Sequence, residues 1–206
     1  MTRSKTSARW LKEHFQDEYV KRARQEGYRS RAVYKLQEID AKDALFKPGM
    51  IVVDLGAAPG GWSQYAVERL GHSGQVIAQD ILPMDSLAGV TVLQGDFREL
   101  DVLEQLLHIL NKRLIDLVIS DMAPNTSGVN AIDQPRMIHL AELAVDFAKQ
   151  QLRPGGDLLV KVFQGEGFDD LLQELRAIFN KVLVRKPKAS RARSKELYLL
   201  ARNYGV

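Results

Sequence analysis

The sequence predicts an α/β fold, in which strands and helices alternate along a single domain. Short apolar runs with the length of buried strands recur along the chain, and stretches with helical spacing of apolar residues lie between them. The 206 residues, 45% of them hydrophobic, can bury one substantial core, whereas two full domains would be cramped. No internal repeat, low-complexity tract or linker divides the chain. We therefore expect one domain with short appendages.

The N-terminal residues predict a basic arm followed by a second helix. Residues 8–26 can form a helix, but its apolar stripe at every fourth position is narrow and buries little surface. We therefore divide the chain into a basic arm at 1–28 and a folded domain at 29–206. In the helix that begins this domain, Lys35 points away from the apolar face that Leu36 helps to form. Taken alone, this lysine is a solvated helix residue.

A glycine-rich turn predicts a ligand site after the first strand. Asp54 ends an apolar run, and a turn containing Gly56 and Gly60 leads into a helix that runs from Trp62 to Leu70. Glycines let the backbone approach a ligand closely, and the free N–H groups of a helix's first turn can meet its negative end. The spacing G-A-A-P-G-G matches the dinucleotide-binding fingerprint poorly. A nucleotide-like ligand is favoured over a purely structural turn, and its identity stays open at this point.

Three later strands end at or beside an acidic residue: Asp80 after 75–80, Asp96 within 91–97 and Asp121 after 114–120. Asp80 lies about 20 residues beyond the glycine turn, where an acid that binds ribose is expected. Asp96 with Phe97 beside it suits an adenine ring and its amino group. Open α/β sheets bind ligands at the carboxyl ends of their strands, so we expect these acids and Asp54 to surround one site.

The remaining elements complete the alternation. Helical patterns and a polar loop separate the later strands, with helices at 99–110, 135–151 and 168–179 and the loop at 126–133. Lys161 interrupts a fifth strand at 157–163, and a buried lysine is costly unless it faces a site or a partner. Residues 181–201 predict two short strands around a basic loop, with Glu196 following its cations.

Charge is distributed unevenly along the chain. Residues 1–35 carry ten Lys and Arg against four Asp and Glu, and residues 181–206 carry eight against one. The stretch between them carries eleven against 21, so two basic ends flank an acidic body. Aromatic residues are interleaved with the basic ends, a combination that is typical of nucleic-acid binding.

The composition excludes several classes of site. The chain has no cysteine, which excludes disulfides, Cys-ligated zinc and a thiol nucleophile. Its N-terminus lacks the apolar core of a secretion signal, and no 18 consecutive apolar residues occur. We expect a cytoplasmic protein without a membrane segment.

The ordered motifs resemble those of class I S-adenosylmethionine-dependent methyltransferases, and more narrowly the FtsJ family of bacterial ribosomal RNA large-subunit methyltransferases. They run from residue 29 to residue 201 and read RSRAVYKLQEID, VDLGAAPGGWSQ, DILPMD, LQGDFRE, SDMAPNTSG, VKVFQGEGFD and SRARSKELYLLA. The resemblance implies a Rossmann-like domain with a mostly parallel seven-stranded sheet, an antiparallel C-terminal strand and helices on both faces.

The resemblance also implies an activity and its residues. The activity is transfer of a methyl group to the 2′-oxygen of a uridine ribose in the A-loop of 23S ribosomal RNA, within the 50S subunit. The family's Lys-Asp-Lys-Glu tetrad falls on Lys35, Asp121, Lys161 and Glu196. Its S-adenosylmethionine contacts fall on Gly60, Trp62, Asp80, Asp96 and Asp121, to which the residue patterns add Asp54, Gly56 and Phe97. No metal is expected, because the sulfonium methyl is already activated, and the protein is expected to be a monomer.

A mechanism can be stated as a hypothesis. The enzyme must align the ribose hydroxyl with the methyl group and help it to lose a proton. We expect Lys161 to be the base and Asp121 to orient it, while Lys35 and Glu196 tune the charge and hold the ribose. The RNA is expected to dock on the basic ends, chiefly on Arg29, Arg31, Lys186, Arg191 and Arg193.

Three alternatives stay open. A related 2′-O-methyltransferase that acts on tRNA or on an mRNA cap would use the same tetrad. A nicotinamide oxidoreductase would use a similar sheet, although the glycine spacing and the two lysines argue against it. A non-catalytic RNA-binding factor of ribosome assembly would retain the basic ends, but it would not require the intact tetrad.

Overall fold

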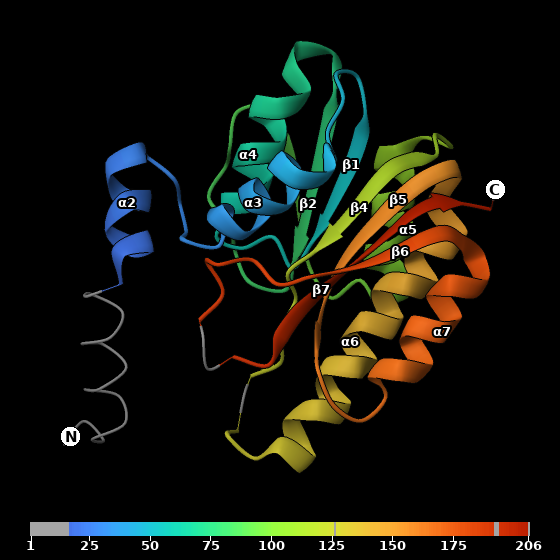
Figure 1. Cartoon of the computed structure of the whole chain (residues 1–206). Coiled ribbons are helices and arrows are strands. Elements are labelled where there is room, and N and C mark those ends of the chain that lie inside the picture. The colour runs from blue at the N-terminus through green and yellow to red at the C-terminus, as the bar shows by residue number, and fades with distance from the viewer. Residues whose placement is uncertain (1–16, 126, 192–193, 206) are drawn as a thin grey trace.

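The computed structural model describes residues 17–125, 127–191 and 194–205, and a seven-stranded sheet runs through them (Figure 1). The strands are β1 (Ile51–Leu55), β2 (Gln75–Asp80), β3 (Val90–Gln94), β4 (Ile115–Ser120), β5 (Leu152–Phe163), β6 (Phe179–Arg185) and β7 (Glu196–Tyr204). Their order across the sheet is β3-β2-β1-β4-β5-β7-β6.

The strand directions confirm the predicted fold class. Neighbouring strands from β3 to β5 pair in parallel, whereas β7 pairs antiparallel with both β5 and β6. The basic loop therefore joins a C-terminal hairpin of β6 and β7, inserted so that β7 lies beside β5. This placement brings the start of β7 next to the carboxyl end of β5, where Phe163 pairs with Glu196.

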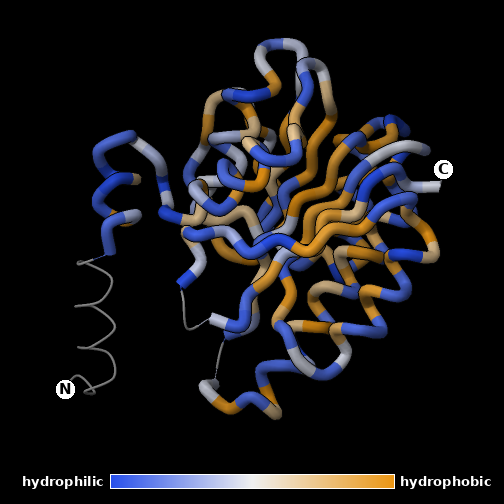
Figure 2. Tube along the Cα trace, viewed as in Figure 1, coloured by the Kyte–Doolittle hydropathy of each residue, from blue (hydrophilic) through white to orange (hydrophobic). Residues whose placement is uncertain are grey.

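Helices cover both faces of the sheet. They are α2 (Glu18–Glu26), α3 (Val33–Asp43), α4 (Gly61–Leu70), α5 (Leu100–Leu110), α6 (Asn130–Gln151) and α7 (Phe168–Ile178), with a short 3-10 helix at Gly71–Ser73. Alternate strand residues face opposite layers. Val52 packs with the residues of α3 and α4, while Val53 packs with those of α5, α6 and α7. The hydropathy colouring shows the apolar strands between these layers (Figure 2).

This alternation determines which way the central lysine faces. Leu159 of β5 belongs to the layer of α3 and α4, whereas Leu158 and Val160 belong to the opposite layer. Lys161 lies two residues after Leu159 and therefore faces the α3 side. Tyr198 of β7 pairs directly with Lys161, and its side chain belongs to the same layer.

Several predicted boundaries differ from the structure. Strand β3 ends at Gln94, so Asp96 follows this strand instead of lying within it. Helix α6 begins at Asn130, five residues before the expected start, and Pro135 lies inside it. The first helical position is a common place for proline, which is why the sequence misplaced this boundary. Strand β5 begins at Leu152, and its pairing with β4 shifts before Asp157, so the predicted strand 157–163 is its regularly paired part.

Helix α2 stands beside the sheet layers rather than over the sheet (Figure 1). Its Ala23 packs with Val33, Tyr34 and Ala189 in a small separate apolar cluster. The N-cap Asp17 accepts a hydrogen bond from the Tyr19 backbone N–H at 3.0 Å, and Gly27 ends the helix in the left-handed conformation. Residues 1–16 of the predicted arm lie outside the described residues. None of the described helices is long and apolar enough to span a membrane.

Candidate active site

The site lies where the strand order reverses. Strand β1 has β2 on one side and β4 on the other, so the connections that follow β1 and β4 leave the sheet in opposite directions. This switch point is where open α/β sheets bind ligands. The glycine turn follows Leu55 at the end of β1, and Asp121 follows Ser120 at the end of β4.

The glycine turn depends on the absence of side chains. Gly56 has a φ of 76°, and a Cβ atom there would lie 2.5 Å from the Met122 Cγ. Gly60 has a φ of 106°, and its Cβ atom would lie 2.9 Å from the Met84 sulfur. Both positions therefore require glycine, for backbone conformation and for space. The turn keeps its backbone close to the residues that follow β2 and β4.

A cavity of about 320 Å³ opens beside this turn. It is lined by Gly56, Ala58, Gln79, Asp80, Ile81, Leu82, Asp96, Phe97, Arg98, Asp121, Met122, Ala123, Asn125 and Leu140. Five of the predicted cofactor residues therefore meet there: Gly56, Asp80, Asp96, Phe97 and Asp121. Carboxylates line part of the cavity and apolar side chains line the rest.

Asp80 connects two of the loops around the cavity. One carboxylate oxygen accepts a hydrogen bond from the Ala58 N–H, and the other accepts one from the Leu82 N–H, each at 2.8 Å. Both loops are thus held at the end of β2 by one side chain. The sequence predicted Asp80 as a ligand contact, and the structure adds this role in loop placement.

Asp96 is paired with a cation that the sequence reading did not identify. The Arg98 Nε donates to both oxygens of Asp96, at 2.8 and 2.9 Å. These hydrogen bonds from Arg98 lower the pKa of Asp96, so its carboxyl group stays ionised. The spacing D-x-R was the available signal, although such short spacings are common on surfaces.

Three predicted cofactor residues lie outside the cavity lining. Asp54 is fully buried beneath the turn and accepts a hydrogen bond from the Ser63 hydroxyl at 2.6 Å. Burial raises its pKa to about 7, with the nearby charges of Asp121 and Asp80 adding to the effect against the Ser63 hydrogen bonds. Trp62 is buried, and its Nε1 donates to the Ala32 carbonyl.

Gly60 also lies outside the cavity lining and serves as the left-handed N-cap of α4. Asp54 and Trp62 are buried beside it, where Asp54 accepts from Ser63 of α4 and Trp62 donates to Ala32, the residue before α3. These three residues shape the site without facing the cavity.

The four residues of the predicted tetrad do come together. The Lys161 Nζ lies 2.9 Å from the Asp121 Oδ1 and also donates to the Asp121 backbone carbonyl. The Lys35 Nζ lies 2.8 Å from the Glu196 Oε1 and 3.8 Å from the Asp121 Oδ1. Two lysines and two carboxylates thus form one connected cluster, with elements as distant in sequence as α3 and β7 contributing to it.

Tyr198 belongs to this cluster, although the sequence reading did not select it. Its hydroxyl donates to the Asp121 Oδ1 at 2.7 Å, and the Lys35 Nζ lies 5.7 Å from the centre of its ring. Burial raises the pKa of Tyr198 well above 10, so the phenol stays a donor. Burial opposes the ionisation of Asp121, but the charges of Lys161 and Lys35 and the Tyr198 hydrogen bond outweigh it and lower the pKa of Asp121.

A second cavity lies on the other side of the tetrad. Its volume is about 290 Å³, and it is lined by Arg31, Ala32, Lys35, Arg191, Ser194 and Glu196. Asp121 lines the first cavity, while Lys35 and Glu196 line the second. The tetrad therefore connects a cavity with acidic and apolar walls to a basic one. This arrangement suits transfer of a group from one bound molecule to another.

Two of the predicted RNA-binding residues already form hydrogen bonds within the protein. The Arg29 guanidinium donates to the backbone carbonyls of Asp85 and Ser86, each at 2.7 Å. The Lys186 amine donates to the backbone carbonyls of Ser194 and Glu196. Both side chains therefore have structural partners in addition to any role with RNA.

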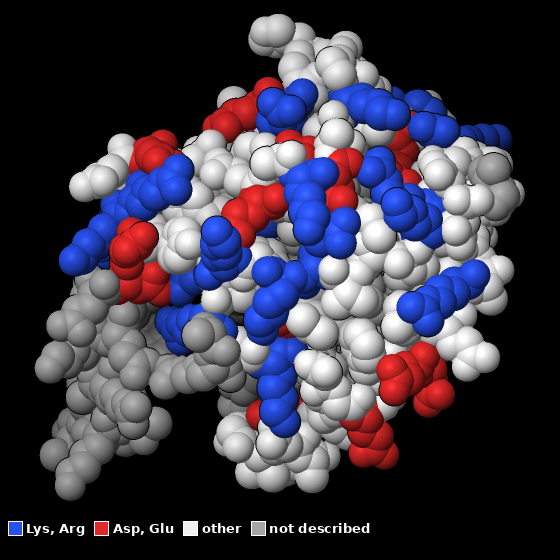
Figure 3. All heavy atoms as spheres, viewed as in Figure 1, with Lys and Arg blue, Asp and Glu red and all other residues white. Residues whose placement is uncertain are grey.

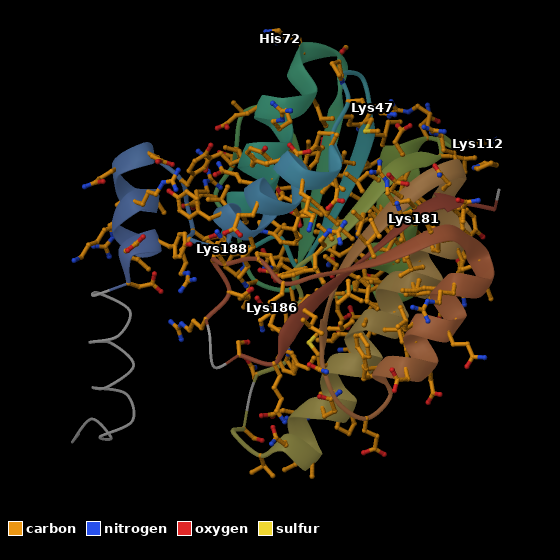
Figure 4. All side chains as sticks on the ribbon, viewed as in Figure 1. Lys47, His72, Lys112, Lys181, Lys186 and Lys188 are labelled. Carbon is orange, nitrogen blue, oxygen red and sulfur yellow. The ribbon has the colours of Figure 1, made fainter. Side chains whose placement is uncertain are left out.

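Two further predicted RNA-binding residues, Arg31 and Arg191, line the second cavity. Arg31 pairs with Asp17 and also donates to the Ala189 carbonyl. Arg193 lies outside the described residues. Lys and Arg side chains run across the middle of the face in Figure 3, with acidic side chains among them. In Figure 4, Lys188 lies near α3 and Lys186 lies below it, while Lys112 lies at the upper right, away from both.

No group of three or more His, Cys, Asp or Glu side chains that could hold a metal ion occurs within 17–125, 127–191 and 194–205.

Comparisons with known proteins confirm the resemblance seen in the motifs. The sequence model of the FtsJ-like methyltransferase family matches residues 28–204. Proteins named ribosomal RNA large subunit methyltransferase E from Chromohalobacter salexigens and Legionella pneumophila are 66% and 61% identical to the chain, over 98% and 100% of it and 96% and 100% of their own lengths. A solved structure described as a ribosomal RNA methyltransferase from Plasmodium falciparum aligns with a TM-score of 0.75 and 32% identity, covering 86% of this chain and 98% of that one. The chain therefore belongs to the FtsJ-like methyltransferase family.

Proposed function

We propose that the protein transfers a methyl group from S-adenosylmethionine to the 2′-oxygen of a uridine ribose in the A-loop of 23S ribosomal RNA. The observation that carries the proposal is the tetrad, which lies between a cavity suited to a nucleoside and a basic cavity suited to RNA. The similar proteins from two bacteria are named for the RNA of the large ribosomal subunit. The protein would accordingly act as a monomer, in the cytoplasm, on RNA within the 50S subunit.

The first cavity fits S-adenosylmethionine. The side-chain oxygens of Asp80 and Asp96 suit hydroxyl and amino donors, while Ile81, Leu82 and Phe97 offer the apolar contact that a flat base requires. The glycine turn leaves room for a ligand close to its backbone. When bound, S-adenosylmethionine supplies a methyl group already activated by the sulfonium charge. The protein is left with positioning and proton transfer.

Lys161 is well placed to take the proton of the ribose hydroxyl. Lys161 can act as a base only after it has lost a proton. Its neutral amine then has two N–H bonds and one lone pair, and Asp121 offers it two acceptors, its Oδ1 and its backbone carbonyl. The lone pair is then free for the hydroxyl proton. That proton would move to the Lys161 Nζ as the ribose oxygen takes the methyl group, which S-adenosylmethionine would supply with the electron pair of the carbon–sulfur bond left on sulfur.

Lys35 and Glu196 would hold the ribose on the side of the second cavity. Lys35 presents its charge near Asp121 and Glu196, so it can donate to a ribose or phosphate oxygen without being buried unpaired. Arg31 and Arg191 continue the positive lining away from the tetrad. The RNA strand would therefore enter along the residues that join α3 to the basic loop.

The proposal is tested with purified protein, S-adenosylmethionine labelled in its methyl group, and 50S subunits from cells that lack the protein. We expect one label per subunit, on a ribose 2′-oxygen of an A-loop uridine. Label on tRNA or on an mRNA cap instead would favour the related methyltransferases. RNA binding without label on any of these substrates would indicate an assembly factor, and tighter binding of NAD than of S-adenosylmethionine would indicate an oxidoreductase.

A further inference from the structure

The basic loop carries a turn, residues 187–190, that is fixed to helix α3. The Glu38 carboxylate accepts hydrogen bonds from the backbone N–H groups of Lys188 and Ala189, at 2.6 and 2.8 Å. Ala189 is fully buried, and the Arg31 guanidinium donates to its carbonyl. The turn closes on itself because the Ser190 N–H donates to the Pro187 carbonyl at 3.0 Å. The turn is therefore held by Glu38 of α3 and by Arg31, which lies two residues before this helix.

The last residue of this turn reaches the tetrad. Ser190 is buried, and its hydroxyl donates to the Glu196 Oε1 at 2.8 Å. The same oxygen lies 2.8 Å from the Lys35 Nζ. One carboxylate oxygen thus accepts from a serine of the loop and pairs with a lysine of α3. The terminal torsion of a glutamate is broad, so a second donor is needed to fix the orientation of its carboxylate.

Helix α3 provides both ends of the resulting chain of contacts. Lys35 and Glu38 are three residues apart and lie on neighbouring turns of the helix. From Lys35 the contacts pass to Glu196, to Ser190, through the turn 187–190 and back to Glu38. A displacement of the turn would therefore move the carboxylate with which Lys35 pairs.

We propose that Ser190 is a positioning residue for methyl transfer, which fixes the Glu196 carboxylate against Lys35, and that Glu38 acts with it by holding the turn. The inference rests on the proposed function, because methyl transfer is the step for which Ser190 would position Glu196. It also makes the basic loop part of the active site, since the Ser190 hydroxyl joins this loop to the side chain of Glu196.

The test compares Ser190→Ala with Ser190→Thr, which retains the hydroxyl. For Ser190→Ala we expect kcat on 50S subunits to fall about tenfold, the low end of the effect of losing a hydrogen bond to a charged group. The dissociation constant for S-adenosylmethionine should stay within about twofold, since Ser190 does not line the first cavity. Ser190→Thr should recover most of the rate.

A purely structural role for Ser190 would not move the pH profile, so this profile is the decisive measurement. A Glu196 carboxylate that is no longer fixed compensates the charge of Lys35 less well, and Lys35 lies beside Asp121, the partner of Lys161. Because added positive charge favours a neutral amine, the acidic limb of kcat against pH, which reports Lys161 in this mechanism, should move to lower pH in Ser190→Ala. Glu38→Gln should displace the pH profile in the same direction and by less. This variant replaces Ser190→Ala in the test if Ser190→Ala does not fold. An unchanged kcat and profile, or a change confined to KM for RNA, would overturn the inference.

A second measurement separates this inference from the proposed function. The side-chain carboxyl carbon of Glu196 can be followed by NMR against pH in the wild type and in Ser190→Ala, without any RNA. We expect a displaced titration in the variant. A displaced titration in a protein that fails to methylate 50S subunits would contradict the proposed substrate and retain the positioning role, whereas identical titrations would overturn the positioning role.

Discussion

Two carboxyl groups at neighbouring strand ends have pKa values that their surroundings shift in opposite directions. Asp121 is close to Lys161, Lys35 and the Tyr198 hydroxyl, which lower its pKa despite burial. Asp54 has one donor, Ser63, and its fully buried position raises its pKa to about 7. Among the residues that the structure describes, the Asp54 Oδ1 receives no hydrogen bond. Near neutral pH the negative charge at the switch point is therefore greater on Asp121, next to Lys161, than on Asp54.

This difference predicts how stability changes with pH. Well below pH 3.8, Asp54 is protonated in both the native and the unfolded chain. Between its ordinary pKa of 3.8 and about 7, the unfolded chain releases the proton while the native state retains it. The free energy of unfolding should therefore fall with rising pH by up to roughly 1.4 kcal/mol per pH unit in this window, relative to Asp54→Asn.

Urea unfolding of both proteins at pH 5, 6, 7 and 8 measures this difference. Asparagine retains an acceptor for the Ser63 hydroxyl, and the other titrating groups cancel in the comparison. Parallel stability curves for the two proteins would show that Asp54 is ionised in the native state throughout this range.

At the scale of elements, the loop between β2 and β3 is held in place by one arginine. The Arg29 guanidinium donates to the carbonyls of Asp85 and Ser86 and, at 3.3 Å, to that of Pro59 in the glycine turn. The loop begins with Ile81 and Leu82, which are exposed and line the first cavity. Arg29 thus joins two walls of the cofactor cavity, whereas the sequence had suggested a contact with RNA.

Arg29→Ala should therefore weaken cofactor binding more than RNA binding. Loss of these hydrogen bonds to exposed loops should raise the dissociation constant for S-adenosylmethionine by about tenfold. Calorimetric titration measures it, and Lys47→Ala is a matched control, because it removes one positive charge from an exposed position outside both cavities. An unchanged affinity for S-adenosylmethionine with weakened RNA binding would instead show that Arg29 contacts RNA.

The elements also show what could be read from sequence. Asp80, Asp96 and Asp121 were predictable because parallel strands end at one edge of the sheet, so a periodic pattern fixes where their last residues lie. Arg29, Glu38 and Ser190 could not be found in this way. Arg29 and Glu38 bond to backbone groups of distant loops, and Ser190 bonds to a side chain whose place depends on the hairpin. The spacing of residues in the sequence does not predict such contacts, because they depend on how distant loops fold against one another.

At the scale of the whole molecule, the basic residues form a surface around the second cavity. Helix α2, the start of α3 and the basic loop meet there, and a third cavity of about 290 Å³ shares Arg31 and Arg191 with the second. Lys188 lines this third cavity, and its side chain is exposed although its backbone is fixed by Glu38. An RNA strand bound to this surface would extend from the tetrad toward α2.

Binding of RNA should therefore depend strongly on salt. The logarithm of the association constant should fall with the logarithm of salt concentration, with a slope near −0.7 for each phosphate neutralised on a single strand. Lys188→Ala should make the slope about 0.7 less steep, while Lys47→Ala should leave it unchanged. Filter binding of an A-loop RNA between low and moderate salt measures both slopes. An association constant that does not change with salt would contradict RNA binding at the basic surface.

The central claim is that the tetrad moves a proton through Lys161. Single-turnover methylation of 50S subunits, measured against pH for the wild type and Lys161→Ala, tests it most directly. The account predicts that the variant loses at least about 100-fold in rate, as expected for a missing general base, and loses the pH dependence with it. A near-normal rate with an unchanged pH profile in Lys161→Ala would contradict the account.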